Sequence, residues 1–226
     1  MKKGTNEELR DVYNKLVTSY DKVNSVITFS QDTKWRYQLI KELSKYCKEP
    51  KFILDIGSGK GELSKIAKIF YKNANFVLLD YAENMLSNSI VEGDKIIASF
   101  NNLPFRENAF DAVISSYAIH ASDDMNQTIK EIYRVTKKAL GITAIGRSNN
   151  ILFSNLVKIY LKCLLQYLVI LAHGDPNHYK YIYYIYTKVP SNKELKRIFG
   201  TYTDIKIFKE KALGSIYLFV GIKKSN

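Results

Sequence analysis

The chain has 226 residues, of which 46% are hydrophobic, and this length and composition favour a single α/β domain with one large core. Its two cysteines, Cys47 and Cys163, lie far apart, which argues against a disulfide framework or a zinc site and predicts a reducing, cytoplasmic location. The net charge of +12 comes mostly from scattered lysines without an arginine-rich block, so nucleic acid is a less favoured partner than an anionic membrane surface. The N-terminal residues are charged and no apolar segment follows them, which argues against a signal peptide.

Residues 1–48 are predicted to form a helical cap, with helices at 7–20 and 32–47. Between residues 49 and 147, short apolar runs alternate with helical patterns, which predicts a parallel sheet covered by helices on both faces. We expect strands at 51–56, 75–80, 95–99, 110–115 and 140–145, and helices at 62–71, 83–91 and 124–137.

Residues 148–192 break this alternation with a long apolar helix, at about 151–172, followed by a tyrosine-rich stretch. Lys158 and Lys162 interrupt the apolar run, and the uncharged stretch after them is too short for a membrane span. Polar residues recur every four positions at Ser154, Lys158, Lys162 and Gln166, which predicts a narrow polar stripe and a wide apolar face to bury.

The last section, 193–226, is predicted to contain a helix and two strands, at 203–208 and 215–222, joined as a hairpin. Together the elements predict one α/β domain. Its sheet should be Rossmann-like, doubly wound, seven-stranded and mostly parallel, with an antiparallel strand contributed by the C-terminal hairpin and with helical lid segments.

The stretch FILDIGSGKGELS, residues 52–64, ends a predicted strand and begins a helix, with glycines at 57, 59 and 61. Glycines there allow positive φ and a close approach of backbone N–H groups to a ligand, and a helix N-terminus adds unpaired donors. The spacing differs from the dinucleotide pattern G-x-G-x-x-G, and the lysine and hydroxyl pair of a phosphate-binding loop is absent. A different nucleotide-like cofactor is therefore expected.

The pattern D-x-G-x-G-x-G that starts at Asp55 resembles motif I of the class I S-adenosylmethionine (SAM) methyltransferases. The resemblance implies that the loop passes under the methionine and ribose of SAM, and that Asp55 helps to orient the amino acid end. It implies contacts to the cofactor from the loop and the helix after it, through Asp55, Gly57, Ser58, Gly59, Gly61 and Ser64.

The next strand, NFVLLD, ends at Asp80, whose carboxylate can accept hydrogen bonds from both hydroxyls of a ribose. By resemblance, Tyr81 and Met85 cover the adenine, although Met85 could equally be a core residue. The third strand ends at Ser99 and Phe100 where the family usually has Asp-Ala or Asn-Ala, so adenine recognition should depend on backbone groups.

The fourth strand ends with Ser115, Ser116 and Tyr117, without the Pro-Pro-aromatic motif of amino-methylating DNA and RNA enzymes. The cysteine nucleophile of cytosine C5 enzymes is also missing near this point. A small-molecule acceptor is therefore favoured, and Ser116 is expected at the cofactor.

The stretch YDKVNSVITFSQDTKWR, residues 20–36, resembles the N-terminal signature of the ubiquinone/menaquinone biosynthesis C-methyltransferases. The matching positions are Tyr20, Asp21, Asn24, Phe29, Trp35 and Arg36, and those that depart from it are Thr28, Ser30, Asp32 and Thr33. The resemblance implies SAM-dependent methylation of a lipophilic aromatic such as a quinol. It places Tyr20 near the methionine end of SAM and Arg36 near its carboxylate, and makes the N-terminal helices and residues 148–192 a lid over the acceptor.

Deprotonating a ring hydroxyl makes the neighbouring carbon a better nucleophile, and His120 is the candidate for that base, with a structural role as the alternative. No metal site is expected from His173, Asp175 and His178. The apolar helix and the tyrosines after it could line a quinol pocket, dock on a membrane, or form lid packing or a dimer interface. Methylation of another small molecule or lipid, and a SAM-binding or RNA-associated accessory role without turnover, remain the alternative functions.

Overall fold

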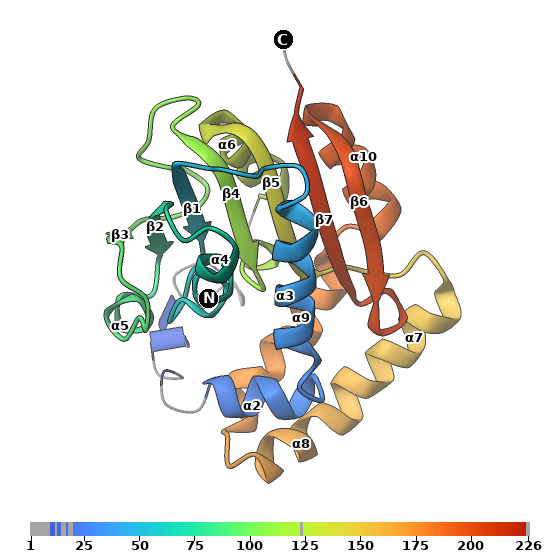
Figure 1. Cartoon of the computed structure of the whole chain (residues 1–226). Helices are drawn as coiled ribbons and strands as arrows, with labels where there is room; N and C mark the ends of the chain where they lie inside the picture. The colour runs from blue at the N-terminus through green and yellow to red at the C-terminus, as the bar shows by residue number, and fades with distance from the viewer. Residues whose placement is uncertain (1–9, 12, 15–16, 18–19, 123, 225–226) are drawn as a thin grey trace.

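The computed structural model describes residues 10–11, 13–14, 17, 20–122 and 124–224 (Figure 1). Of the helix expected at 7–20, only residues 10–11, 13–14, 17 and 20 are described, and the remaining positions of that prediction stay untested. Helix and strand labels below are those of Figure 1.

The described residues contain a seven-stranded sheet in the order β3-β2-β1-β4-β5-β7-β6 (Figure 1). Only β7 runs against its neighbours, because β5 and β6 both pair with it in antiparallel fashion and the other pairs are parallel. The strands are β1 Phe52–Ile56, β2 Asn75–Asp80, β3 Asp94–Ile97, β4 Phe110–Ser116, β5 Thr136–Ile145, β6 Thr203–Lys211 and β7 Ile216–Lys223. The predicted fold class is confirmed.

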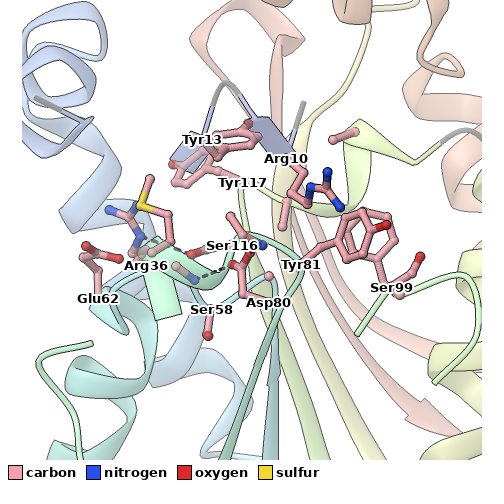
Figure 2. Close-up of a pocket in the computed structure, with 17 residues that line it drawn as sticks. Arg10, Tyr13, Arg36, Ser58, Glu62, Asp80, Tyr81, Ser99, Ser116 and Tyr117 are labelled. Carbon is pink, nitrogen blue, oxygen red and sulfur yellow. Dashed lines mark hydrogen bonds between the residues drawn. The ribbon is translucent and has the colours of Figure 1, made fainter. Parts of the chain in front are cut away.

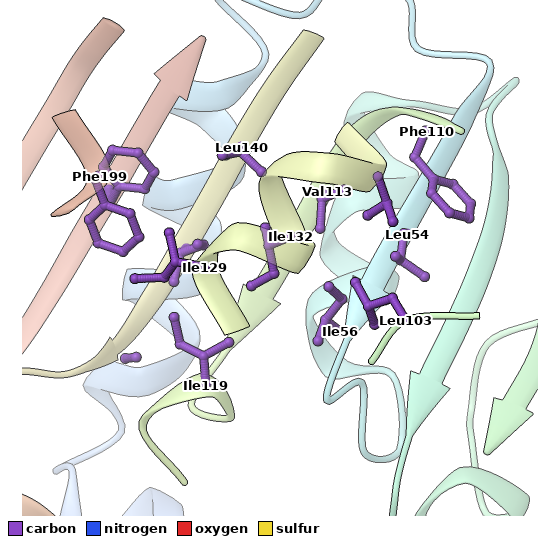
Figure 3. Packing of buried hydrophobic residues seen from close by; sticks show 14 of the residues in the cluster. Leu54, Ile56, Leu103, Phe110, Val113, Ile119, Ile129, Ile132, Leu140 and Phe199 are labelled. Carbon is purple, nitrogen blue, oxygen red and sulfur yellow. The ribbon is translucent and has the colours of Figure 1, made fainter. Parts of the chain in front are cut away.

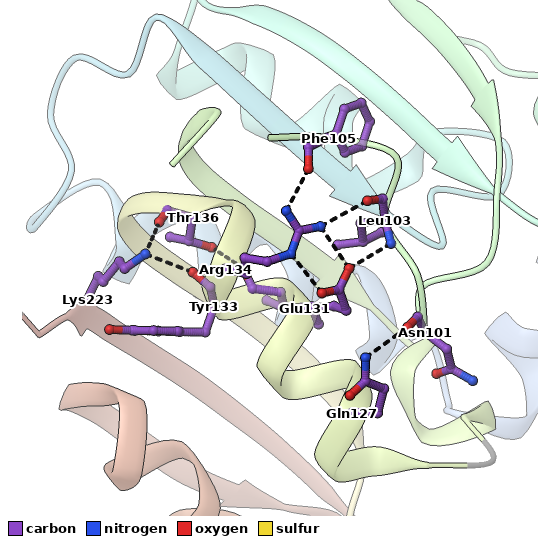
Figure 4. A network of polar contacts seen from close by, with 10 residues as sticks. Asn101, Leu103, Phe105, Gln127, Glu131, Tyr133, Arg134, Thr136 and Lys223 are labelled. Atoms are coloured by element: carbon purple, nitrogen blue, oxygen red, sulfur yellow. Dashed lines mark hydrogen bonds and ion pairs between the residues drawn. The ribbon is translucent and has the colours of Figure 1, made fainter. Parts of the chain in front are cut away.

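β5 begins at Thr136, four residues before the predicted start, directly after helix α6 (Met125–Val135). No proline or glycine separates the two elements in the sequence Val-Thr-Lys-Lys-Ala, so the chain passes from helix into strand without a loop. Lys223 of β7 stabilises this junction because its Nζ donates to the carbonyl oxygens of Tyr133 and Thr136, at 3.1 and 2.9 Å (Figure 4).

Helices cover both faces of the sheet, as the alternation of elements predicts. On one face, α3 (Gln31–Leu43) and α4 (Glu62–Phe70) pack against β1, β2, β4, β5 and β7. On the other face, α6 and α10 (Asn192–Tyr202) pack Ile129, Ile132 and Phe199 onto the sheet (Figure 3). Burial of these aliphatic and aromatic side chains supplies the main stabilising free energy of the core.

A group of helices lies beyond the carboxyl ends of the parallel strands, and we call it the lid (Figure 1). It consists of α2 Tyr20–Ile27, α7 Ile151–Ile159, the π-helical turn η2 Tyr160–Leu164, α8 Leu165–Leu171 and α9 Lys180–Lys188. The lid has its own small core, in which Val23 of α2 and Val169 of α8 meet Met85, next to the end of β2. Short helices complete the described chain: α5 Glu83–Ser87, η1 Ile119–Ala121, η3 Pro176–Tyr179 and η4 Ala212–Gly214.

The polar stripe expected on α7 to α8 is not straight. Ser154 is buried and Lys162 is exposed, because each four-residue step drifts by about 40° around an α-helix and the steps add up. The lid therefore buries one side of this helix and leaves several large apolar side chains on the other side exposed.

Candidate active site

The glycine turn after β1 forms the floor of a cleft at the carboxyl ends of the strands. Gly57 has φ of +64°, and a Cβ at this residue would lie 2.1 Å from Cβ of Ala118 in the segment after β4. The turn thus needs glycine for its backbone conformation and also for its packing against that segment. Gly61, at φ +90°, is the N-cap of α4 and lies beneath the end of α5.

Asp80, at the end of β2, is held rigidly by the backbone. Its Oδ2 accepts from the N–H of Gly59 at 2.7 Å, and its Oδ1 accepts from the N–H of Ala82 at 2.8 Å (Figure 2). Burial raises the pKa of this carboxyl, and these backbone donors act in the opposite direction. A carboxylate has about four lone-pair sites, so Asp80 can still accept a hydrogen bond from a ligand.

The cleft brings together most of the predicted cofactor residues. Arg36 and Glu62 lie at one end, and Tyr81 and Ser99 lie at the other, with Asp80 between them (Figure 2). The predicted residues that line the cleft are Arg36, Gly57, Ser58, Gly59, Asp80, Tyr81, Met85, Ser99, Phe100 and Ser116. Met85 is also 2% exposed and part of the lid core, as its alternative role predicts, and its contact with the adenine stays a prediction.

Three predicted cofactor residues do not line the cleft. Asp55 and Ser64 are fully buried below the turn, where the hydroxyl of Ser64 donates to Oδ2 of Asp55 at 2.6 Å, and Gly61 caps α4. Burial raises the pKa of Asp55 to about 7. Asp55 thus supports the turn through Ser64, while its Oδ1 has no hydrogen-bond partner among the described residues, and its expected role at the amino acid end of SAM stays a prediction. The side chain of Tyr20 lies outside the described ones.

Sequence analysis missed several lining residues. Arg10 places its guanidinium 5.3 Å from the ring centroid of Tyr81, and Tyr13 and Tyr117 close the cleft toward the lid. The others are Glu62, Ala82, Ala118 and Ala121. Tyr117 follows Ser116 at the strand end and could have been found from that position, whereas Arg10 and Tyr13 carry no local signal.

An apolar chamber of about 390 Å³ lies beside the cleft and beneath the lid. Tyr13, Arg36 and Tyr117 line both cavities, so the two adjoin at these side chains. The walls come from α2, α3, α7 to α8, α9 and the β6–β7 connection, and include Ile27, Phe29, Trp35, Leu156, Val157, Tyr160, Leu161, Leu165, Ile182, Leu213 and Ile216.

A buried ion pair stands where the chamber meets the cleft. Nη1 of Arg36 lies 2.7 Å from Oδ2 of Asp32, and Oδ1 of Asp32 accepts from the hydroxyl of Thr28 at 3.1 Å. Nε of Arg36 donates to Ser116 at 3.2 Å, and its guanidinium lies 4.9 Å from the ring centroid of Tyr117. Asp32 and Thr28 are two of the positions that depart from the N-terminal signature, and here they form one connected polar group.

His120 lies at the chamber and not at the cleft. Its Nδ1 accepts from the backbone N–H of Ile145 at 3.5 Å, which requires the ring proton to reside on Nε2. Burial lowers the pKa of His120 to about 4. Its ring is therefore neutral at pH 7 with Nε2 as a donor, a state that suits a hydrogen-bond donor better than the predicted general base.

The loop between β3 and β4 is fixed by a polar network on α6. Arg134 donates to the carbonyl oxygens of Leu103 and Phe105, and Glu131 accepts from the N–H of Leu103 at 2.9 Å (Figure 4). Glu131 and Arg134 also pair with each other at 2.7 Å. The network anchors the chain just after Ser99 and Phe100 and so helps to position that wall of the cleft.

A family model described as the ubiE/COQ5 methyltransferase family matches residues 1–223. The chain belongs to this family. A demethylmenaquinone methyltransferase of Thermotoga maritima is 25% identical over 184 residues, which cover 79% of this chain and 80% of the relative. A demethylmenaquinone methyltransferase of Lactobacillus johnsonii is 25% identical over 232 residues, 96% of this chain and 93% of the relative.

Solved structures share the fold of this ubiE/COQ5 family member. A SAM-dependent methyltransferase of Thermotoga maritima, described as a possible histamine N-methyltransferase, has a TM-score of 0.66 at 16% identity and covers 96% of this chain and 100% of its own. A putative methyltransferase in complex with the Haloferax volcanii Trm112 activator has a TM-score of 0.67 at 14% identity. The match covers 94% of this chain and 98% of the other.

The ubiE/COQ5 family member is therefore a SAM-dependent methyltransferase that acts on a small molecule. Its cleft fits the cofactor. The glycine turn forms a floor, Asp80 has lone pairs available, and the buried hydroxyl of Ser58 has no hydrogen-bond partner among the described residues.

Proposed function

We propose that this enzyme transfers the methyl group of SAM to a ring carbon of a lipophilic, hydroxylated aromatic of the quinol type. The observation that carries the proposal is the apolar chamber of about 390 Å³ that adjoins the cleft and contains one buried carboxylate at the junction. The names of the demethylmenaquinone methyltransferase relatives support the same acceptor class.

In this proposal the cleft residues hold the cofactor. Asp80 accepts hydrogen bonds from the ribose hydroxyls, Tyr81 and Met85 lie beside the adenine, and Arg36 lies near the carboxylate of the methionine part of SAM. SAM supplies an electrophilic methyl group when it is bound. The protein's main contribution is to align the acceptor carbon with that methyl and to exclude water, which the apolar walls of the chamber favour.

Asp32 activates the acceptor by accepting a hydrogen bond from the ring hydroxyl, which increases the electron density on the neighbouring ring carbon. It is 8% exposed, and its ion pair with Arg36 orients the carboxylate. The new carbon–carbon bond forms as the methyl–sulfur bond breaks, and the proton of the ring carbon leaves to solvent. His120 donates from Nε2 to a second oxygen of the acceptor.

The test incubates the enzyme with isotope-labelled SAM and a naphthoquinol that carries a short isoprenoid tail, kept reduced by dithionite. We expect S-adenosylhomocysteine and a product labelled on a ring carbon, located by NMR. Asp32→Asn should lower turnover by roughly 10–100-fold, as loss of a charged hydrogen bond predicts, while S-adenosylhomocysteine still binds. The control Asp204→Asn changes an exposed carboxylate outside both cavities.

A label on an oxygen of the naphthoquinol would contradict ring methylation. Absence of transfer to any quinol, while S-adenosylhomocysteine still binds, would contradict the proposed acceptor class. Salt-sensitive RNA binding without methyl transfer to any fraction of a cell extract would favour an accessory role instead.

A further inference from the structure

The helical stretch from α7 to α8 exposes an apolar surface, which we call the outer face. Its members are Ile151, Leu152, Ile159, Leu164, Tyr167, Ile170 and Leu171, and Ile151 and Leu171 are 79% and 72% exposed. Within the described part of the chain, this is the one helix long and apolar enough to cross a membrane. Its most apolar 18-residue stretch has a mean hydropathy of 1.4, and 22% of that stretch is buried in the protein. Many exposed apolar side chains on one helix mark an interaction site.

The opposite side of the same helix is anchored to the folded domain. Val157, Leu161 and Leu165 line the chamber, and the hydroxyl of Tyr160 donates to the carbonyl oxygen of Ile27 at 2.7 Å. Val169 is fully buried in the lid core. A helix held in this way cannot span a bilayer while the domain stays folded, but it can lie in the plane of the interface with its outer face in the acyl layer.

The charges of this helix complement an anionic surface. Lys158 and Lys162 are its charged residues, and no Asp or Glu occurs between residues 151 and 171. In a two-fold dimer built on this face, the lysines of the two copies would meet without a carboxylate from the same helix between them. Next to anionic lipid headgroups, each lysine near the surface would be attracted instead.

We propose that the outer face docks on an anionic lipid bilayer as an interfacial helix, which brings the wall of the chamber against the acyl layer. The docking itself needs neither SAM nor an acceptor. It rests on the proposed function only for its consequence, namely that a lipophilic acceptor passes from the bilayer to the chamber along α7 and α8.

The test measures sedimentation of the intact protein with phosphatidylcholine vesicles, with and without an equal part of phosphatidylglycerol, in the absence of any substrate. We expect binding to the mixed vesicles that weakens with salt. Cys163 is exposed on the helix and Cys47 is buried, so a polarity-sensitive dye on Cys163 should shift its emission to the blue when vesicles are added.

Two pairs of variants locate the contact. Leu152→Glu/Ile159→Glu should weaken vesicle binding by about tenfold or more, whereas Ile69→Glu/Ile90→Glu, at residues of similar exposure away from the lid, should not. Lys158→Gln/Lys162→Gln should weaken binding about tenfold on the anionic vesicles alone, and the control Lys65→Gln/Lys72→Gln should not. Retained S-adenosylhomocysteine binding shows that each variant is folded.

Vesicle binding that is absent, or that is equal in the Leu152→Glu/Ile159→Glu and control variants, would overturn the proposal. A dimer of the intact protein that Leu152→Glu/Ile159→Glu converts to monomer, without vesicle binding, would overturn it in favour of a second copy. Ring methylation can succeed or fail independently of either result, so failure of the docking and failure of the proposed function are distinguishable.

Discussion

The cleft and the chamber lie side by side but are built in different ways. The cleft is formed mainly by short turns at the ends of adjacent strands, where backbone groups of Gly59 and Ala82 hold Asp80. The chamber is closed by contacts between distant segments, such as the hydrogen bond from Tyr160 to Ile27. A site built from strand ends depends on local sequence and the sheet, whereas an apolar chamber depends on how separate helices pack, so its shape tolerates more change.

The largest expected effect separates the cleft from the rest of the fold. Asp80→Asn should weaken S-adenosylhomocysteine binding by about 3 kcal/mol or more, roughly a hundredfold, because charged hydrogen bonds to the ribose are lost. Calorimetric titration measures this. Asp111→Asn is the matched control, since Asp111 also accepts from two backbone N–H groups, those of Lys51 and Phe52, but does not line either cavity. Equal loss of binding in the two variants would contradict a specific role for Asp80.

The pH dependence of stability should differ in sign between the two regions. The pKa of Asp55, below the cleft, is raised to about 7, so the folded state binds the Asp55 proton more tightly than the unfolded state does. The contribution of Asp55 to the free energy of unfolding therefore falls as pH rises from about 4 to 7. The pKa of His120, at the chamber, is lowered to about 4, so its contribution rises with pH between about 4 and 6.5. These contributions, of at most about 4 and 3 kcal/mol, oppose each other in the intact protein.

Each single variant should reveal the contribution of the other group. In denaturant unfolding across this pH range, His120→Gln should become less stable as pH rises, and Asp55→Asn should become more stable. Parallel profiles for the two variants would show that neither group titrates as its burial predicts.

The smallest effect tests the packing of the glycine turn against the segment after β4. Gly57→Ala should destabilise the protein by about 1–3 kcal/mol more than Gly59→Ala, because both residues have positive φ but only the first adds a clash. The added methyl would lie 2.1 Å from Cβ of Ala118, whereas the nearest atom to a Cβ at Gly59 is 3.8 Å away. Adding Ala118→Gly to Gly57→Ala should remove this clash and recover the extra loss of stability, measured by thermal unfolding. A double variant no more stable than Gly57→Ala would exclude this clash as the cause.

The sheet and the cleft could be predicted because their signals are local. Apolar runs locate β1 and β2, the resemblance of the glycine pattern around Gly57 and Gly59 to motif I indicates the cofactor, and Asp80 follows from its position at a strand end. Local pattern could not show that Asp55 is fully buried below the turn, because this depends on its hydrogen bond to Ser64 and on the packing around it.

The sequence by itself determined the order of elements, the fold class and the chemical type of the cofactor, because hydrophobic periodicity and glycine spacing act over a few residues. Only the tertiary structure decided that Arg36, beside Asp32 on one helix, reaches Ser116, that Ile145 lies against Nδ1 of His120, and that α7 to α8 is covered on one side only. Those properties arise from contacts between segments that are distant in the chain, and such contacts depend on how the lid packs over the sheet.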